Sequence, residues 1–168
     1  MKGTRIRVTV LLAGVATAGL LPQSAAQAPK EQAPERRIVL VAGNDPWTET
    51  DIEIYPGDRV TFNGAGEVCF SGAAKDSCQG PAGWGREDYA NSWPDDYHQC
   101  EDPMSDANHA SLIGSIGGGV FYIGPETTVT NEAGALRLGI NDCTFEGDYG
   151  NSGQYSVVIR IVRGKPPR

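Results

Sequence analysis

The chain has 168 residues, a length that fits one domain able to bury about two thirds of its unfolded surface. It contains 21 acidic and 14 basic residues, a net charge of −7. An acidic balance repels nucleic acid and anionic lipid and suits divalent cations, so we expect no nucleic-acid partner.

The first 28 residues have the pattern of a secretory signal peptide. A basic start, an apolar stretch and a small-x-small cleavage site follow one another at residues 2–7, 8–21 and 26–28. The apolar stretch is too short and too interrupted to hold a membrane span of about 20 residues. We therefore predict a secreted, periplasmic or extracellular protein without a membrane span. Its mature part, residues 29–168, keeps 11 of the 14 basic residues against 21 acidic ones, a net charge of −10.

Residues 29–36 are rich in Pro, Gln and charge and predict a disordered leader, and residues 164–168 predict a flexible tail. Between them, residues 37–163 predict one domain in which apolar and polar residues alternate or β-branched residues cluster. No long segment keeps the helical period, and 22 Gly with 11 Pro would break most helices. We expect an all-β, two-sheet sandwich with Greek-key or jelly-roll connections. The predicted strands are 37–42, 51–54, 59–62, 112–116, 120–123, 127–130, 135–140 and 155–162.

A long stretch, residues 71–110, shows little alternation and predicts a functional loop. It contains Trp84 and both histidines, His98 and His109. Trp84 has two interpretations: a platform for the apolar face of a sugar ring, or a core side chain that caps the end of the sandwich. The histidines lack diagnostic spacing, so we expect both to be solvated.

Four cysteines, Cys69, Cys78, Cys100 and Cys143, make an even number in an exported chain and contain no CxxC spacing. Two disulfide bonds are therefore predicted rather than a metal site. Three pairings are possible. We favour Cys69 with Cys78, because they flank a short polar stretch, which leaves Cys100 with Cys143 beside Asp142.

The segment 141–153 joins two predicted strands and gathers several oxygen-bearing side chains in one turn. Calcium takes six to eight oxygen ligands from carboxylates, amides and backbone carbonyls, so this segment is a candidate calcium site. The alternative is an ordinary solvated loop in which Asn and Asp favour turns. The spacing is not that of an EF-hand.

Five short motifs follow one another along the chain: Ile54-Tyr55-Pro56-Gly57-Asp58, Gly80-Pro81-Ala82-Gly83, Ala110-Ser111-Leu112-Ile113-Gly114-Ser115-Ile116-Gly117, Leu138-Gly139-Ile140-Asn141-Asp142 and Asn151-Ser152-Gly153. In this order they resemble the PA-I-type galactophilic bacterial lectins and their relatives. The likeness extends from Trp47 to Val162, and it implies a jelly-roll-like β-sandwich with one calcium ion at its edge, bound directly by two vicinal sugar hydroxyls.

The resemblance also implies a set of calcium ligands. Asp142 would bind the ion and accept a sugar hydrogen bond, Asn151 would supply an amide oxygen, and a backbone carbonyl near Phe70 would be a further ligand. Family members have two consecutive amides before Ser-Gly, whereas here a glycine precedes Asn151. One ligand is therefore missing unless Asp148 or Glu146 takes its place.

Sugar contacts would come from Asp142 and Asn151. The His and Gln expected after the Gly-Pro motif are not evident; Asp88 occupies the comparable place, with Trp84 close by in the sequence. Calcium is therefore better supported than galactose as the ligand.

We predict a secreted calcium-dependent carbohydrate-binding module whose partner is a galactoside-like or other glycan. Because family members often associate, a homo-oligomer is compatible with the resemblance. One alternative is a structural or adhesion sandwich that has lost sugar binding. A glycoside hydrolase would need two carboxyls across a cleft, and adjacent acids such as Asp95-Asp96 or Glu101-Asp102 are ordinary surface, so we predict no enzyme.

Overall fold

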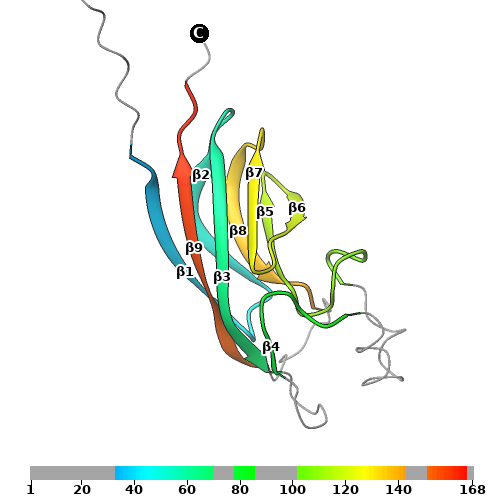
Figure 1. Cartoon of the computed structure of the whole chain (residues 1–168). Helices are drawn as coiled ribbons and strands as arrows, with labels where there is room; N and C mark the ends of the chain where they lie inside the picture. The colour runs from blue at the N-terminus through cyan, green and yellow to red at the C-terminus, as the bar shows by residue number, and fades with distance from the viewer. Residues whose placement is uncertain (1–32, 70–77, 86–101, 143–150, 166–168) are drawn as a thin grey trace, which may run out of the picture. The chain divides into compact units, whose positions relative to one another are not determined.

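The computed structural model describes residues 33–69, 78–85, 102–142 and 151–165, which belong to one compact unit, Gln32–Arg168 (Figure 1). These residues form β-strands, and none of them lies in a helix able to cross a bilayer. The strands are β1 (Glu35–Ala42), β2 (Trp47–Ile54), β3 (Arg59–Cys69), β4 (Cys78–Gln79), β5 (Leu112–Ile116), β6 (Gly119–Tyr122), β7 (Glu126–Thr130), β8 (Gly134–Ile140) and β9 (Ser152–Val162).

The strands form two antiparallel sheets that face one another (Figure 1). The first sheet has the order β1-β9-β3, and the far edge of β3 is shared by β7 and β4. The second sheet has the order β2-β8-β5-β6. The all-β, two-sheet sandwich predicted from the sequence is thus confirmed.

The core lies between the sheets and is made by alternate residues of the long strands. Successive side chains of a strand point to opposite faces, so from Tyr155 onward every second residue of β9 is buried while its neighbours are more exposed. The inward residues of β3, β8 and β9 are Val60, Phe62, Val68, Leu136, Leu138, Ile140, Tyr155, Val157, Ile159 and Ile161.

The structure corrects the predicted chain organisation in two places. β1 begins at Glu35, so the last two residues of the predicted leader pair with Arg160 and Ile161 of β9. The short strand β4 and an isolated bridge between Trp84 and His109 lie in the stretch that we expected to be a loop. The two residues of β4 and the single residue pair of the bridge are too short to leave a local alternation to recognise.

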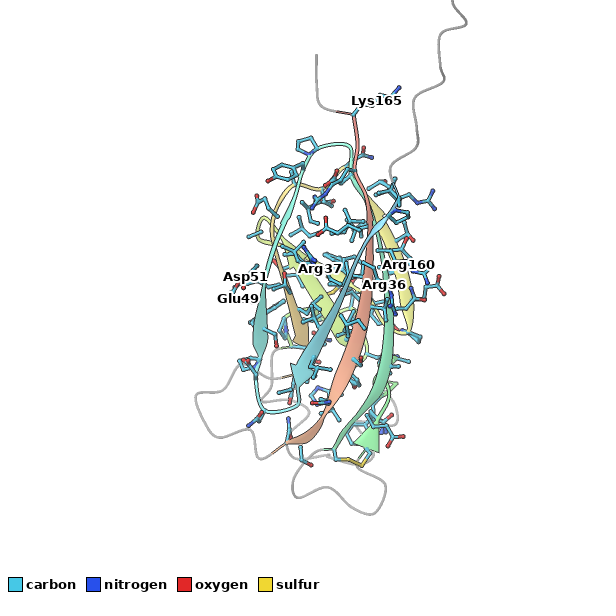
Figure 2. All side chains as sticks on the ribbon, turned by 90° about the vertical axis from the view of Figure 1, so that its left-hand side faces the viewer. Arg36, Arg37, Glu49, Asp51, Arg160 and Lys165 are labelled. Carbon is cyan, nitrogen blue, oxygen red and sulfur yellow. A yellow bond between two sulfur atoms is a disulfide. The ribbon has the colours of Figure 1, made fainter. Side chains whose placement is uncertain are left out.

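The edge strands β1 and β2 carry charged side chains (Figure 2). Arg36 and Arg37 project from β1, and Glu49 and Asp51 project from β2. The pairing of β2 with β8 shifts register between Glu49 and Ile52, where the φ of Asp51 is 54°. Charges and register shifts of this kind oppose edge-to-edge pairing between molecules.

A buried carboxylate ties the two termini of the domain together. Asp58 is 3% exposed and accepts hydrogen bonds from the N–H groups of Tyr55 (3.0 Å) and Gly164 (2.8 Å) and from the guanidinium of Arg163 (2.7 Å). Arg163 also donates to Glu35 at 2.9 Å. The beginning of the predicted tail is therefore anchored to the turn that precedes β3.

Candidate functional site

Two of the predicted calcium ligands converge at one end of the sandwich. Asp142 follows β8, and Asn151 immediately precedes β9. The Nδ2 of Asn151 donates a hydrogen bond to the Oδ2 of Asp142 at 2.8 Å. The carboxylate and the amide are thus neighbours, although nine positions separate them in the chain.

The backbone before Asp142 is held by a buried amide. The Oδ1 of Asn141 accepts a hydrogen bond from the N–H of Met104 at 2.8 Å, and its Nδ2 donates to the carbonyls of Met104 and Asn108, both at 3.0 Å. Main-chain bonds join Asn141 to Ala110 (2.7 Å) and Ser111 (2.8 Å). These contacts dock residues 102–111 against the end of β8.

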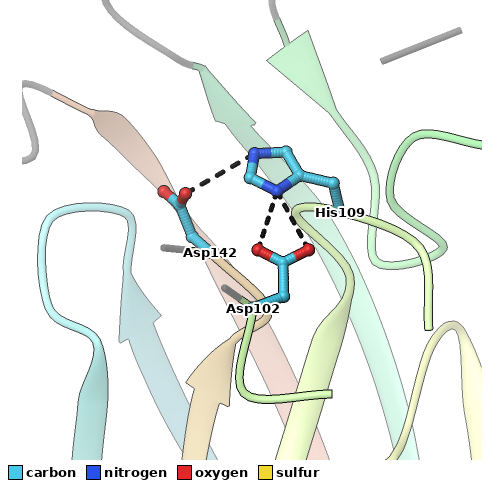
Figure 3. Close-up of side chains that lie close together, drawn as sticks. All are labelled: Asp102, His109 and Asp142. Atoms are coloured by element: carbon cyan, nitrogen blue, oxygen red, sulfur yellow. Dashed lines mark hydrogen bonds and ion pairs between the residues drawn. The ribbon is translucent and has the colours of Figure 1, made fainter. Parts of the chain in front are cut away.

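Docking brings Asp102 and His109 to Asp142 (Figure 3). The Nδ1 of His109 lies 3.0 and 3.2 Å from the two carboxylate oxygens of Asp102, and its Nε2 lies 3.5 Å from the Oδ1 of Asp142. The side chain of His109 is 6% exposed, and those of Asp102 and Asp142 are 16% and 15% exposed. The expectation that His109 is solvated is therefore wrong, because tertiary docking decides its burial.

Trp84, which follows a tight turn, packs against the imidazole of His109. Its N–H donates to the carbonyl of His109 at 2.8 Å, and its ring stacks on the imidazole with 6.4 Å between centroids and 7° between planes. The preceding Gly83 has a φ of +72°, and a Cβ there would lie 2.4 Å from the His109 carbonyl oxygen. Trp84 is half-buried against the core, which favours its interpretation as a cap on the end of the sandwich.

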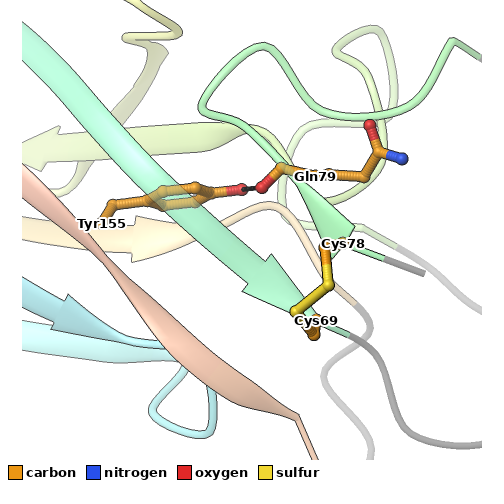
Figure 4. The surroundings of a disulfide bond; sticks show 4 residues. All are labelled: Cys69, Cys78, Gln79 and Tyr155. Atoms are coloured by element: carbon orange, nitrogen blue, oxygen red, sulfur yellow. Dashed lines mark hydrogen bonds between the residues drawn. A yellow bond between two sulfur atoms is a disulfide. The ribbon is translucent and has the colours of Figure 1, made fainter. Parts of the chain in front are cut away.

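The same end of the molecule is braced by a disulfide bond (Figure 4). Cys69 at the end of β3 is bonded to Cys78 in β4, the pairing that we favoured. Beside it, the buried hydroxyl of Tyr155 is 3.1 Å from the carbonyl oxygen of Gln79, to which it donates. These contacts fix β4, from which the chain runs into the turn that carries Trp84.

Several predicted site residues lie outside the part of the chain that the structure describes, so their roles stay predictions. They are Phe70 and Asp148 as metal ligands, Asp88 as a sugar contact, and Cys100 with Cys143 as a disulfide.

Sequence reasoning missed Asp102, His109 and Asn141 as members of the site. Asp102 was considered only as half of an acidic pair, and His109 only as a loop histidine. Asn141 belongs to a motif of the lectin resemblance but received no role. No local pattern links these residues, because the cluster is assembled from segments more than 30 positions apart.

The donor set at Asp142 has two chemically different sides. On the Oδ2 side lies the amide of Asn151, and carboxylate and amide oxygens are ligands that calcium accepts. A 180° rotation of the side-chain amide of Asn151 would place its oxygen, in place of its nitrogen, on the side that faces Asp142. On the Oδ1 side lies the ring nitrogen of His109, a ligand type suited to zinc and other transition metals rather than to calcium.

No protein-family model matches this chain, and no curated protein matches it significantly. Among solved structures, it is similar to the N-terminal domain of EclA, described as a PllA-like lectin, with a TM-score of 0.49 and 16% sequence identity. The likeness covers 73% of this chain and 92% of that one. The sheet order and the distances at the site are those of contacts within this chain.

Proposed function

We propose that this protein is an exported, non-catalytic carbohydrate-binding module that holds a calcium ion where β8 ends and β9 begins. The observation that carries the proposal is the convergence of Asp142 and Asn151, whose Nδ2 and Oδ2 atoms are 2.8 Å apart. The resemblance to galactophilic lectins independently assigned both residues to one calcium shell. Two residues chosen from sequence motifs therefore meet in space.

The chemistry of such a module is the exchange of water for sugar on the ion. Calcium, when bound, supplies the positive charge that two adjacent sugar hydroxyls can ligate in place of two waters. Asp142 and Asn151 would hold the ion, and Asp142 would also accept a hydrogen bond from the sugar. Because the Asn141 contacts fix the backbone at Asp142, the carboxylate can select hydroxyls by their direction.

Three further predicted contacts belong to the same proposal. The carbonyl of Phe70 and the carboxylate of Asp148 would complete the oxygen shell, and Asp88 would contact the sugar. Trp84 would contribute the part of its ring that His109 does not cover, since the imidazole stacks against one face of the indole. Galactosides are the first sugars to test, followed by other glycans.

The test is retention of the purified protein on immobilised galactosides and on a panel of other glycans, with calcium and with a chelator. We expect retention that requires calcium and is abolished in Asp142→Ala. The matched control is Glu132→Gln, which changes an exposed acid next to β7. This residue lies at the other end of β3 from the site: the end of β7 pairs with Arg59, whereas Ser152, beside the site, pairs with Cys69. Retention that persists in the chelator would contradict the proposal. Absence of calcium uptake in calorimetry would leave the structural or adhesion sandwich as the function.

A further inference from the structure

The imidazole of His109 faces a carboxylate at each of its nitrogens. The contacts of Nδ1 with Asp102 (3.0 and 3.2 Å) are ordinary hydrogen-bond distances, whereas Nε2 is 3.5 Å from the Oδ1 of Asp142. A neutral imidazole carries one N–H. The shorter contacts assign that proton to Nδ1, so Nε2 presents a lone pair toward a carboxylate oxygen. Two acceptors in this arrangement repel one another unless a positive charge lies between them.

We propose that the Nε2 of His109 and the Oδ1 of Asp142 are two ligands of a divalent transition-metal site of the zinc class. Bonds of about 2.1 Å to nitrogen and oxygen at a tetrahedral angle separate the two ligand atoms by about 3.4 Å. The observed separation is 3.5 Å. One imidazole nitrogen with carboxylate oxygen is a mixed set that zinc accepts and calcium does not favour.

Asp102 is a positioning residue in this site. Histidine ligands in metal sites commonly donate their other N–H to a carboxylate, which fixes the tautomer and makes the ligating nitrogen more basic. Asp102 occupies that place at Nδ1. The Trp84 ring stacks on the imidazole, and Asn151 donates to the second oxygen of Asp142, so both ligands are oriented before the ion arrives.

This ion would be distinct from calcium. It would lie on the Oδ1 side of Asp142, whereas the Asn151 amide lies on the Oδ2 side. Two protein ligands leave positions for water or for a hydroxyl of a bound molecule, so we expect a readily exchangeable ion rather than a closed structural site. The inference does not depend on sugar binding.

The first experiment titrates zinc alone into the purified, metal-stripped protein in calcium-free buffer by calorimetry. We expect one zinc ion per chain and an affinity reduced about tenfold or more in His109→Gln. Asp102→Asn should weaken binding by about 10- to 100-fold, the usual effect of losing the carboxylate behind a histidine ligand. The matched control is His98→Gln, which removes the chain's other histidine and should leave the affinity unchanged.

A second measurement on the unaltered protein avoids any folding defect of the variants. Zinc should shift the ¹⁵N resonance of Nε2 in His109 strongly and that of Nδ1 weakly. An absence of zinc uptake, or equal affinity in the wild type and His109→Gln, would overturn the inference. Calcium titration separates the two proposals. A wild-type protein that takes up calcium but no zinc overturns only this inference, whereas His109→Gln should lose zinc affinity and keep its calcium uptake.

Discussion

At the scale of single residues, buried polar groups make the clearest stability predictions. Burial alone raises the pKa of Asp58, but the N–H groups of Tyr55 and Gly164 and the charge of Arg163 outweigh it and bring the pKa below its ordinary value. The stability that this carboxylate contributes is complete above the pKa of an unfolded aspartate, about 3.9. It is lost as the pH falls through the lower pKa of the folded state.

We therefore expect Asp58→Asn to lower the free energy of unfolding by about 2–3 kcal/mol at pH 7, since hydrogen bonds to a charged group are lost. Urea unfolding at pH 7 and at successively lower pH below about 4 measures this. The gap between wild type and variant should shrink at low pH. A gap of constant size would show that the ionised carboxylate is not the stabilising form. The exposed Asp106→Asn is the control and should have little effect at either pH.

Tyr155 shares one hydroxyl proton among three carbonyl groups. Its hydroxyl lies 3.1, 3.0 and 2.9 Å from the oxygens of Gln79, Gly80 and Ala110, and burial raises its pKa, which keeps the phenol protonated. Tyr155→Phe should cost about 1–3 kcal/mol in denaturant unfolding, because buried acceptors lose their donor. Tyr122→Phe, at an exposed tyrosine, should change stability by less than about 0.5 kcal/mol. Equal effects of the two variants would refute this assignment.

Ser115 is a buried hydroxyl whose oxygen has no hydrogen-bond partner among the described residues. Removing a polar atom in that situation avoids its desolvation cost. We expect Ser115→Ala to be neutral or to stabilise the protein by up to about 1 kcal/mol in thermal unfolding. If Ser115→Ala instead lowers the free energy of unfolding by more than about 1 kcal/mol, the hydroxyl has a hydrogen-bond partner.

At the scale of elements, the turn at Gly83 decides whether Trp84 reaches His109. Ala at this position would adopt an unfavourable φ and would also place its Cβ 2.4 Å from the His109 carbonyl oxygen. Gly118→Ala isolates the first effect, because Gly118 also has a positive φ but no atom lies within 4 Å of its Cβ position. Gly83→Ala should lower stability by more than the roughly 1 kcal/mol expected for Gly118→Ala and should weaken zinc uptake, both measured on the same preparations.

The strands themselves were the part of the structure most accessible from the sequence. The segment 112–116 was predicted with the bounds that β5 has, and the alternation of Leu136, Leu138 and Ile140 marked buried residues of β8. A strand with one buried face leaves a period of two in its own residues. β4 has two residues and no such period, so only its pairing with β3 reveals it.

At the scale of the whole molecule, ligand binding should appear as stability. An ion that binds only the folded state at 100 times its dissociation constant adds about 2.7 kcal/mol to the free energy of unfolding. We expect calcium at that excess to shift urea unfolding of the wild type accordingly and to leave Asp142→Ala unchanged. An equal shift in both proteins would place the ion elsewhere.

The sequence by itself determined the all-β class and most strand positions, and it favoured the Cys69–Cys78 bond and Asp142 with Asn151 as neighbours. Each of these follows from local periodicity, short spacing or an ordered set of motifs. Only the tertiary structure decided that His109 is buried between Asp102 and Asp142. That cluster requires residues 102–111 to dock on β8 through Asn141, and such long-range contacts leave no periodic trace in the chain.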